Sequence, residues 1–180
     1  MAKMTDIKEV IKSPDNVKMS FNDNILNVQG ENGVLTRTFY HPSIDVKMDG
    51  NSIEIKCSNP RKKEKAIAGT FAAHIKNMIR GVTSGFEYKM KTVYSHFPIK
   101  TSVEGNDFVI QNFLGERYAR KASILEGVKV VVKGDDITVT GIDKEKVGQT
   151  VANIERATKV RNRDIRVFQD GVYLINKGGR

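Results

Sequence analysis

The sequence predicts an α+β protein with two tandem duplicated domains, each a small and mostly antiparallel sheet packed with one helix. Three observations support this fold class: turn signals that recur at a nearly constant offset, short apolar runs separated by hairpin turns, and one amphipathic helix pattern in each half. The chain has 180 residues, which suffice for one ordinary domain or two small ones. The repeat favours two small domains.

Five ordered pairs of positions indicate the duplication. In each pair the second position follows the first by 81–84 residues, and the pairs are Asn22 and Gly105, Gly33 and Gly115, Gly50 and Gly134, Pro14 and Pro98, and Lys65 and Lys146. Any antiparallel protein has Gly, Asn and Asp turns at similar spacing, so chance spacing is the alternative explanation. The constant order of the pairs favours duplication.

Hairpins are predicted at three turns: Asn22-Asp23-Asn24, Asp49-Gly50-Asn51 and Gly134-Asp135-Asp136. The first turn is flanked by the predicted strands Val17–Phe21 and Ile25–Gln29, and the second by Ile44–Met48 and Ser52–Lys56. The third is flanked by Val128–Lys133 and Ile137–Thr140. Before the second turn, apolar residues alternate with Asp45 and Lys47, which is typical of a half-buried strand.

Each half also contains one predicted helix. In the first, Lys65, Lys76 and Arg80 lie within about 60° of one another, opposite an apolar stripe formed by Ile67, Phe71, Ile75, Met78 and Ile79. The second helix begins near Glu145, and its inner stripe consists of Val147, Val151, Ile154 and Thr158. Because neither helix is apolar all round, each is expected to cover one sheet face.

The junction between the halves is predicted at Gly81-Val82-Thr83-Ser84-Gly85, because Gly81 suits the C′ position that ends a helix. The N-terminal α+β repeat is therefore expected at residues 1–82 and the C-terminal repeat at residues 83–180.

Composition excludes several classes of protein. Hydrophobic residues make up 39% of the chain, which argues against disorder, and a single cysteine, Cys57, which we expect to be buried, rules out a disulfide scaffold. No stretch approaches the roughly 18 apolar residues of a membrane span, and the first residues lack the apolar segment of a secretory signal. We therefore expect a cytoplasmic protein with no membrane partner.

No pattern for catalysis or cofactor binding stands out. The segment Gly81–Gly85 lacks the Gly-Lys-Ser/Thr ending of a nucleotide-binding loop, and His41, His74 and His96 lack the spacing of zinc ligands. His41 and His96 each precede a turn that contains proline, where they are either structural or placed to stack on a base. We expect no cofactor, no metal and no enzymatic activity.

The positive charge is concentrated in two blocks. The formal net charge is +9, and Arg61–Lys100 holds 9 basic and 2 acidic residues while Arg156–Arg180 holds 7 and 2. Clustered positive charge is typical of a protein that binds a polyanion, because a surface that serves solubility mixes its signs. For Lys62 and Lys63 a solvated face explains the charge equally well.

The second domain carries the predicted RNA-binding site. The segment Arg117-Tyr118-Ala119-Arg120-Lys121 places an aromatic ring among cations, which suits phosphate contact together with stacking. A second cluster, at the end of the second helix, is rich in arginine, which binds phosphate bidentately. The candidate residues are Arg117, Arg120, Lys121, Arg156, Lys159, Arg161, Arg163, Arg166 and Lys177.

Four ordered motifs resemble the universal large-subunit ribosomal protein family called L6 in bacteria and L9 in eukaryotes. The first, Arg80–Met90, resembles the junction of that family, and the others resemble its archaeal and eukaryotic branch: Val93–Lys100, Asn112–Glu116 and Asp164–Tyr173. The resemblance covers essentially the whole chain. The long extensions typical of eukaryotic relatives are lacking, so we expect an archaeal source.

The resemblance implies two duplicated α+β domains and a structural role in the large ribosomal subunit, in support of translation. It implies contacts with large-subunit ribosomal RNA, mainly through the C-terminal domain, and with neighbouring ribosomal proteins at the stalk base. It also implies a location near the sarcin–ricin region, where translational GTPases dock. The Lys/Gly-rich motif of bacterial members is replaced here by Arg161–Arg166. The alternatives are an RNA-processing enzyme and a module that recruits a translation factor.

Overall fold

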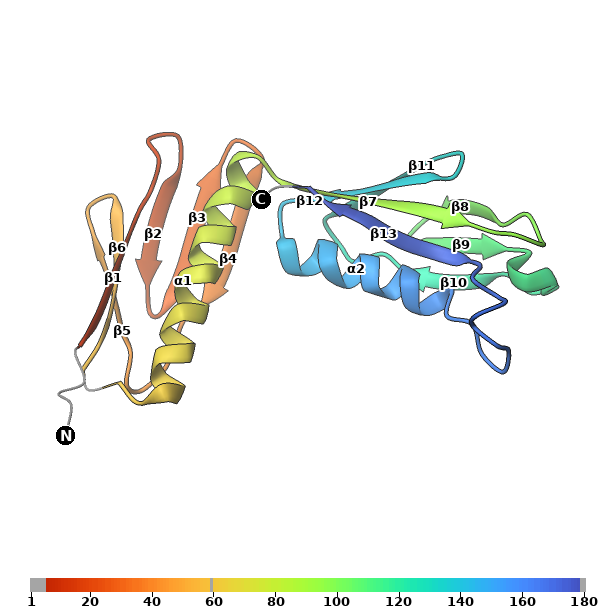
Figure 1. Ribbon diagram of the computed structural model, residues 1–180. Helices are drawn as coiled ribbons and strands as arrows, with labels where there is room; N and C mark the ends of the chain where they lie inside the picture. Colours follow the sequence, from red (N-terminus) through yellow and green to blue (C-terminus); the bar gives the residue numbers. More distant parts are fainter. Residues whose placement is uncertain (1–5, 59, 179–180) are drawn as a thin grey trace. The chain divides into compact units, whose positions relative to one another are not determined.

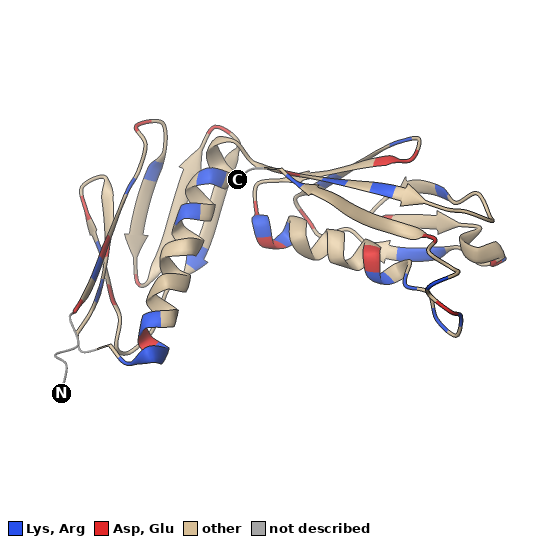
Figure 2. Ribbon diagram, viewed as in Figure 1, with Lys and Arg blue, Asp and Glu red and all other residues tan. Residues whose placement is uncertain are grey.

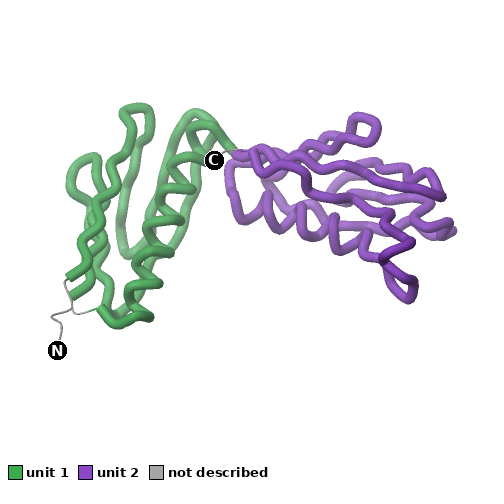
Figure 3. The backbone as a smooth tube through the Cα atoms, in the orientation of Figure 1, with its two compact units in different colours: residues 1–85 green, residues 86–180 purple. Residues whose placement is uncertain are grey.

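A computed structural model describes residues 6–58 and 60–178 of the chain. The chain divides into two compact units, Met1–Gly85 and Phe86–Arg180, which we call unit 1 and unit 2 (Figure 3). The division falls three residues after the predicted boundary at residue 82. Each unit has its own hydrophobic core.

Unit 1 consists of two antiparallel three-stranded sheets and helix α1, which spans Lys62–Thr83 (Figure 1). One sheet has the strand order β1–β6–β5, with β1 at Ile7–Lys12, β6 at Ser52–Cys57 and β5 at Asp45–Asp49. The other has the order β2–β3–β4, with β2 at Lys18–Asn22, β3 at Ile25–Gly30 and β4 at Gly33–Thr38. Helix α1 contacts strands of both sheets and covers the core.

Unit 2 repeats this plan and extends it. Its three-stranded sheet has the order β10–β9–β8, with β10 at Arg120–Ser123, β9 at Asp107–Gln111 and β8 at Lys100–Glu104. Its four-stranded sheet has the order β11–β12–β7–β13, with β11 at Val128–Lys133, β12 at Asp136–Gly141, β7 at Phe86–Val93 and β13 at Gly171–Lys177. A short 3₁₀ helix, η1, spans Phe113–Gly115, and helix α2 spans Lys144–Ala157.

The two units match strand for strand. In unit 1 the central strand β6 pairs with β1 and β5, and in unit 2 the central strand β12 pairs with β7 and β11. Likewise β3 lies between β2 and β4 as β9 lies between β8 and β10. The predicted fold class is confirmed, and the structure adds that the strands of each unit divide between two sheets. Among the described residues of unit 1, strand β13 has no counterpart, and it extends the second copy.

The predicted hairpin turns form because their residues tolerate left-handed backbone conformations. Asp23 and Asn24 have φ values of 50° and 62°, and they join β2 to β3 as a two-residue turn. Gly50 and Gly134 have φ values of 56° and 62° at the equivalent turns after β5 and β11. Asn22, Asp49 and Asp136 belong to strands β2, β5 and β12, so each of the three turns is one residue shorter than predicted.

The end of helix α1 differs from the prediction at Gly81. The helix continues through Gly81, which is buried, to Thr83, and Ser84 is its C-cap. Gly85 takes the left-handed conformation, with φ of 69°, and its backbone N–H donates to the carbonyl oxygens of Arg80 and Gly81. Gly85 is therefore the glycine that ends the helix, and the junction lies there.

The amphipathic patterns place the apolar side of each helix against its own sheets. Ala68, Ile75 and Val82 of α1 are buried, as are Val147, Val151 and Ile154 of α2. Neither described helix has the length and apolar character needed to cross a membrane.

Candidate nucleic-acid interface

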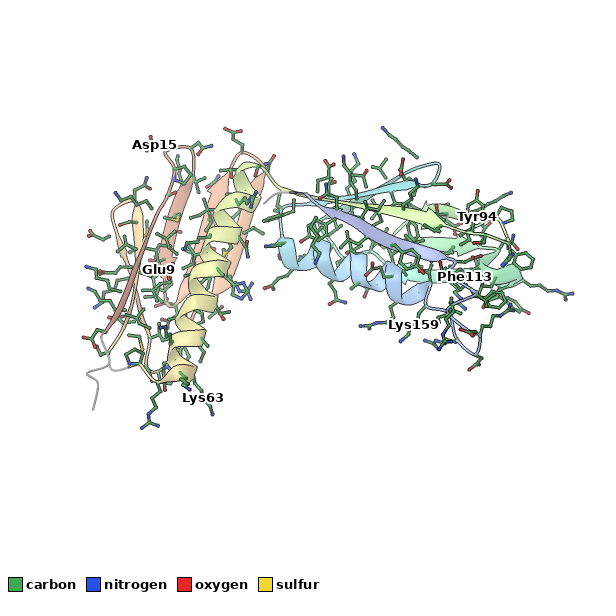
Figure 4. The ribbon with its side chains drawn as sticks, in the orientation of Figure 1. Glu9, Asp15, Lys63, Tyr94, Phe113 and Lys159 are labelled. Carbon is green, nitrogen blue, oxygen red and sulfur yellow. The ribbon has the colours of Figure 1, made fainter. Side chains whose placement is uncertain are left out.

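Three loops meet at one end of unit 2, and most of the predicted RNA-binding residues lie on or beside them. We call them the aromatic loop (residues 94–99), the middle loop (residues 112–119) and the arginine loop (residues 158–170). Strand pairing sets Gly171, which follows the arginine loop, opposite Val93, which precedes the aromatic loop. Figure 4 labels Tyr94, Phe113 and Lys159 at this end, which we call the three-loop end.

The arginine loop is anchored at both of its ends. The backbone N–H of Val172 donates to the Thr158 hydroxyl (3.1 Å), which brings the two ends of the loop together. The Tyr173 hydroxyl donates to the carbonyl oxygen of Gln169 (3.0 Å), and the backbone N–H of Leu174 donates to the Glu155 carboxylate (3.0 Å). These bonds fix the loop against α2 and β13 and leave its tip in solvent.

The tip of the arginine loop is shaped by its only acidic residue before Asp170. The Asp164 carboxylate accepts the backbone N–H of Arg166 (2.9 Å), and the Asp164 carbonyl accepts those of Val167 and Phe168. Asn162 supplies the left-handed residue of the turn, with φ of 57°. Asp164 therefore stabilises the turn, and it forms no ion pair with a cation in the described part of the chain.

A ring contact joins the arginine loop to the aromatic loop. The guanidinium of Arg163 lies over the Phe168 ring, 4.8 Å from its centroid, and the His96 ring meets Phe168 edge-on at 5.9 Å. Phe168 thus contacts one cation and one histidine ring and helps to hold both in place. This position supports the structural interpretation of His96.

The aromatic loop is held by Asp170 and by Asn112, the N-cap of η1. Asp170 is fully buried, and its carboxylate accepts the backbone N–H of Ser95 (3.1 Å). The Asn112 side chain donates to the carbonyl oxygen of Pro98 (3.1 Å). Tyr94 and Phe97 remain 41% and 40% exposed, so each presents part of its ring to solvent. The sequence prediction did not include these two rings, because their place beside the arginine loop depends on the pairing of β7 with β13.

Arg120 differs from the other predicted RNA-binding residues because its guanidinium is already engaged. It donates twice to Glu116, through Nε to Oε2 (2.8 Å) and Nη2 to Oε1 (2.6 Å). Its Nη1 donates to the carbonyl oxygens of Ala157 (2.8 Å) and Lys159 (3.1 Å). The guanidinium carbon Cζ lies over the Phe113 ring, 4.2 Å from its centroid. Four of its five N–H donors are used, so Arg120 joins the middle loop to the end of α2. We therefore assign it a structural role and remove it from the phosphate-binding set.

The remaining cations of this end are exposed and available. Lys121, Arg156 and Arg161 line a hollow of about 360 Å³ beside Arg120. Arg117, Arg156, Lys159, Arg161 and Arg166 form no ion pair within residues 6–58 and 60–178, and Lys121 lies 3.9 Å from the Asp107 carboxylate. A concave group of cations in which Arg156 and Arg161 have no anionic partner among the described residues suits phosphate oxygens.

An apolar groove lies on the other side of Arg156. Its volume is about 610 Å³, and its lining includes Ile165, Phe168 and Tyr173 together with Arg156 and Lys159. Tyr118, on the middle loop, is 88% exposed and has no described ring contact. The three-loop end thus combines cations with apolar and aromatic surface, which is the combination needed for phosphate contact and base stacking.

Lys177 lies away from this group. Strand β13 runs antiparallel to β7 from Gly171, opposite Val93, to Lys177, opposite Tyr88. Lys177 lines a separate hollow of about 660 Å³ with Phe86, Tyr88 and Lys144, at the other end of the sheet. The structure therefore does not bring Lys177 together with the other predicted residues.

The electrostatics of the site show one clear pKa effect. Hydrogen bonding to Arg120 is the main cause that lowers the pKa of Glu116, and the charges of Arg120 and Arg163 add to it. Burial tends to raise the pKa of Glu116, but the net shift of this pKa is downward. Glu116 is therefore anionic at neutral pH, and it keeps Arg120 in its structural position.

Two further features of the described residues concern metal binding and the reactivity of the single cysteine. Within residues 6–58 and 60–178, no group of three or more His, Cys, Asp and Glu side chains is arranged to hold a metal ion. Cys57 is buried, as predicted, and burial raises the pKa of its thiol. A buried thiol with a raised pKa is a poor nucleophile.

Comparisons with known proteins relate the chain to one family. The family model described as "Ribosomal protein L6" matches residues 13–85 and 97–171. A protein of Methanobrevibacter smithii named "Large ribosomal subunit protein uL6" is 53% identical over 171 residues, which are 95% of this chain and 96% of the relative. Proteins with the same name from Methanosphaera stadtmanae and Methanococcus vannielii are 51% and 46% identical, each over more than nine-tenths of both chains. The two matched segments fall one in each half of the chain.

Proposed function

The chain belongs to the ribosomal protein L6 family, and we propose that it is a structural component of the large ribosomal subunit that binds large-subunit ribosomal RNA through the three-loop end of unit 2. The names of the relatives support the place in the large subunit. The observation that carries the RNA contact is the set of exposed cations around the end of α2, of which Arg156, Lys159, Arg161 and Arg166 form no ion pair within residues 6–58 and 60–178.

The proposed contact divides into two kinds of interaction. Arg117, Lys121, Arg156, Lys159, Arg161 and Arg166 bind phosphate oxygens and fix the orientation of the protein on the RNA. Tyr118, Tyr94 and Phe97 stack on bases or sugars that the folded RNA exposes in loops and bulges. Arg163 is held by Phe168 and adds a positive charge to the three-loop end.

Within the residues that the structure describes, the arginine loop and β13 belong to the second copy alone, and this supports placing the RNA contact there. Unit 1 ends its repeat with α1, whereas unit 2 continues after α2 into the arginine loop and an added strand. An extension of one copy gives two duplicated units different surfaces and therefore a basis for different roles.

We propose in addition that the protein lies near the stalk base and the sarcin–ricin region, with ribosomal proteins as neighbours and translational GTPases nearby. The resemblance of the motifs Val93–Lys100 and Asp164–Tyr173 to the archaeal and eukaryotic branch supports this location. Both motifs contribute to the three-loop end, since Val93 and Gly171 are paired.

A salt titration with the purified protein and fragments of large-subunit RNA tests the proposed contact. If the protein neutralises about 6–10 phosphates, its affinity falls by roughly 10³–10⁵ between 50 and 200 mM salt, because binding releases that number of counterions. Affinity that does not depend on salt would contradict the electrostatic interpretation. Recovery of intact RNA after binding separates this proposal from the alternative of an RNA-processing enzyme.

A further inference from the structure

Helix α1 of unit 1 has a positively charged face that the RNA contact proposed for unit 2 does not use. The helix buries Ala68, Ala72, Ile75, Met78 and Val82 toward its sheets. At 100° per residue, its cations Lys62, Lys65, Lys76 and Arg80 lie within about 60° of one another on the opposite side. Figure 2 shows cations near both ends of this helix, and Figure 4 labels the neighbouring Lys63 at its beginning.

These cations have little anionic compensation. Glu64 is the sole acidic residue in the sequence of α1, and it is partly buried on the side of the helix that faces the sheets. Lys76 pairs with Glu9 of β1 (2.7 Å). Within the part of the chain that the structure describes, Lys62, Lys65 and Arg80 form no ion pair.

The middle of the charged face is flat and neutral. Ala66, Gly69 and Ala73 are exposed between the two groups of cations. A glycine inside a helix lowers stability relative to alanine, and packing normally explains its presence. A Cβ added at Gly69 would meet no atom within 4 Å, so nothing within unit 1 requires the missing side chain. Close approach of another molecule to this point of the helix would explain it.

We propose that the outer face of α1 is a second RNA-docking surface, on which the helix lies across the minor groove of an RNA duplex. The cations Lys62 and Lys65 at one end, and Lys76 and Arg80 at the other, contact the phosphates of the two strands. Lys62 and Arg80 are about 27 Å apart along the axis, and Lys65 and Lys76 about 16 Å. Ala66, Gly69 and Ala73 lie between them over the 2′-hydroxyl groups.

The chemistry of the face favours RNA over a protein partner. The core of a protein interface is usually built on large apolar or aromatic side chains. Between its cations this face offers only small residues, with Ile67 and Phe71 turned toward the core. RNA duplexes, in contrast, present a wide and shallow minor groove that is recognised by shape, phosphates and 2′-hydroxyls.

Lysine acetylation followed by mass spectrometry of the full chain tests the proposal, because it reports each surface separately. The probe is an RNA duplex of about 16 base pairs. We expect the duplex to protect Lys62 and Lys65, whereas Lys12, Lys18 and Lys47, exposed on the strands of the same unit, keep their reactivity. Lys121 and Lys159 report the three-loop end in the same sample, so failure of one site is distinguished from failure of the other.

A substitution in the neutral middle of the charged face of α1 provides the second part of the test. Gly69→Leu is expected to fold, because the added side chain meets open space, and to lose the protection of Lys62 and Lys65 by blocking close approach. Gly148→Leu is the matched control in α2, where an added Cβ also meets no atom within 4 Å. Thermal unfolding of both variants checks that they are folded.

Three results would overturn the proposal. One is equal protection of the α1 lysines and the three strand lysines, which would indicate unspecific binding. Another is unchanged protection in Gly69→Leu. The third is equal protection by a DNA duplex of the same sequence or by poly-glutamate, which would indicate a general polyanion surface or an acidic protein partner.

Discussion

Glu116 and Arg120 form a bidentate ion pair, with Arg120 Nε 2.8 Å from Glu116 Oε2 and Nη2 2.6 Å from Oε1. The same guanidinium binds the carbonyl oxygens of Ala157 and Lys159, where α2 ends and the arginine loop begins. Arg120 therefore connects the middle loop to the arginine loop. A cation that the sequence assigned to RNA instead holds two parts of the proposed RNA-binding surface in position.

Replacement of Arg120 by Gln is expected to destabilise unit 2 by about 2–3 kcal/mol. The substitution removes several charge-assisted hydrogen bonds and leaves two carbonyl oxygens without their donor. Chemical denaturation measures the loss. Arg117→Gln, the matched control, changes the same charge at an exposed position and is expected to leave stability within about 0.5 kcal/mol of wild type. Equal stability of the two variants would contradict the structural role of Arg120.

The lowered pKa of Glu116 predicts a pH-dependent contribution to stability. Its ordinary value is 4.5, and the folded protein holds it below that value. As pH falls below about 4.5, the unfolded chain binds the proton first, so the stability from the pair is present above this pH and is lost below it. Because 41% of the Glu116 side chain is exposed, water screens the pair and limits the contribution to at most about 1 kcal/mol.

Unfolding of Glu116→Gln between pH 6 and pH 3 is the corresponding measurement. The stability difference from wild type is expected to be constant above about pH 5 and to shrink as the pH falls through the lowered pKa. Glu126→Gln, at an exposed position of the same unit, serves as the control. A difference that stays constant to pH 3 would show that the ion pair does not stabilise the folded state.

Loss of the arginine-loop cations is expected to weaken RNA binding and to reduce its salt dependence. Arg161→Gln with Arg166→Gln removes two of the proposed phosphate contacts, so the slope of log affinity against log salt should fall by about 2. Lys177→Gln is the control, because Lys177 lies at the other end of the sheet. A loss in Lys177→Gln as large as that of the double variant, after correction for the number of charges, would place the contact elsewhere on unit 2.

Removal of the Tyr118 ring tests the stacking part of the contact. The ring is 88% exposed, so Tyr118→Ala is expected to leave stability unchanged and to weaken RNA binding by about 1–3 kcal/mol, with no change in the salt slope. Tyr40, 71% exposed in unit 1, provides the matched control as Tyr40→Ala. Equal RNA affinities of the two variants would exclude stacking on Tyr118.

Local patterns predicted much of the fold. Two-residue turns such as Asp23-Asn24 and the 3.6-residue spacing of apolar side chains depend on neighbours in sequence, so the hairpins and both helices could be inferred. The end of α1 could not be placed, because Gly81 and Gly85 are both compatible with a helix end. Burial of Gly81 within unit 1 decides between them, and burial depends on tertiary packing.

The candidate site was predicted less completely than the fold. Clustered charge identified the arginine loop, which stays close in sequence. The structural role of Arg120 depends on carbonyl groups of residues 157 and 159, more than 35 positions away, and the separation of Lys177 depends on the direction of β13. Charge counting alone does not distinguish a cation that is available to RNA from one that is used within the fold.

Ultraviolet crosslinking of intact large subunits, with mass spectrometry of the peptides attached to RNA, tests whether the three-loop end binds ribosomal RNA. We expect crosslinked peptides from the three-loop end, with attachment points within residues 94–99, 117–121 and 156–166. Crosslinks in unit 2 that are confined to the opposite end of the sheet, around Lys144 and Lys177, would contradict it.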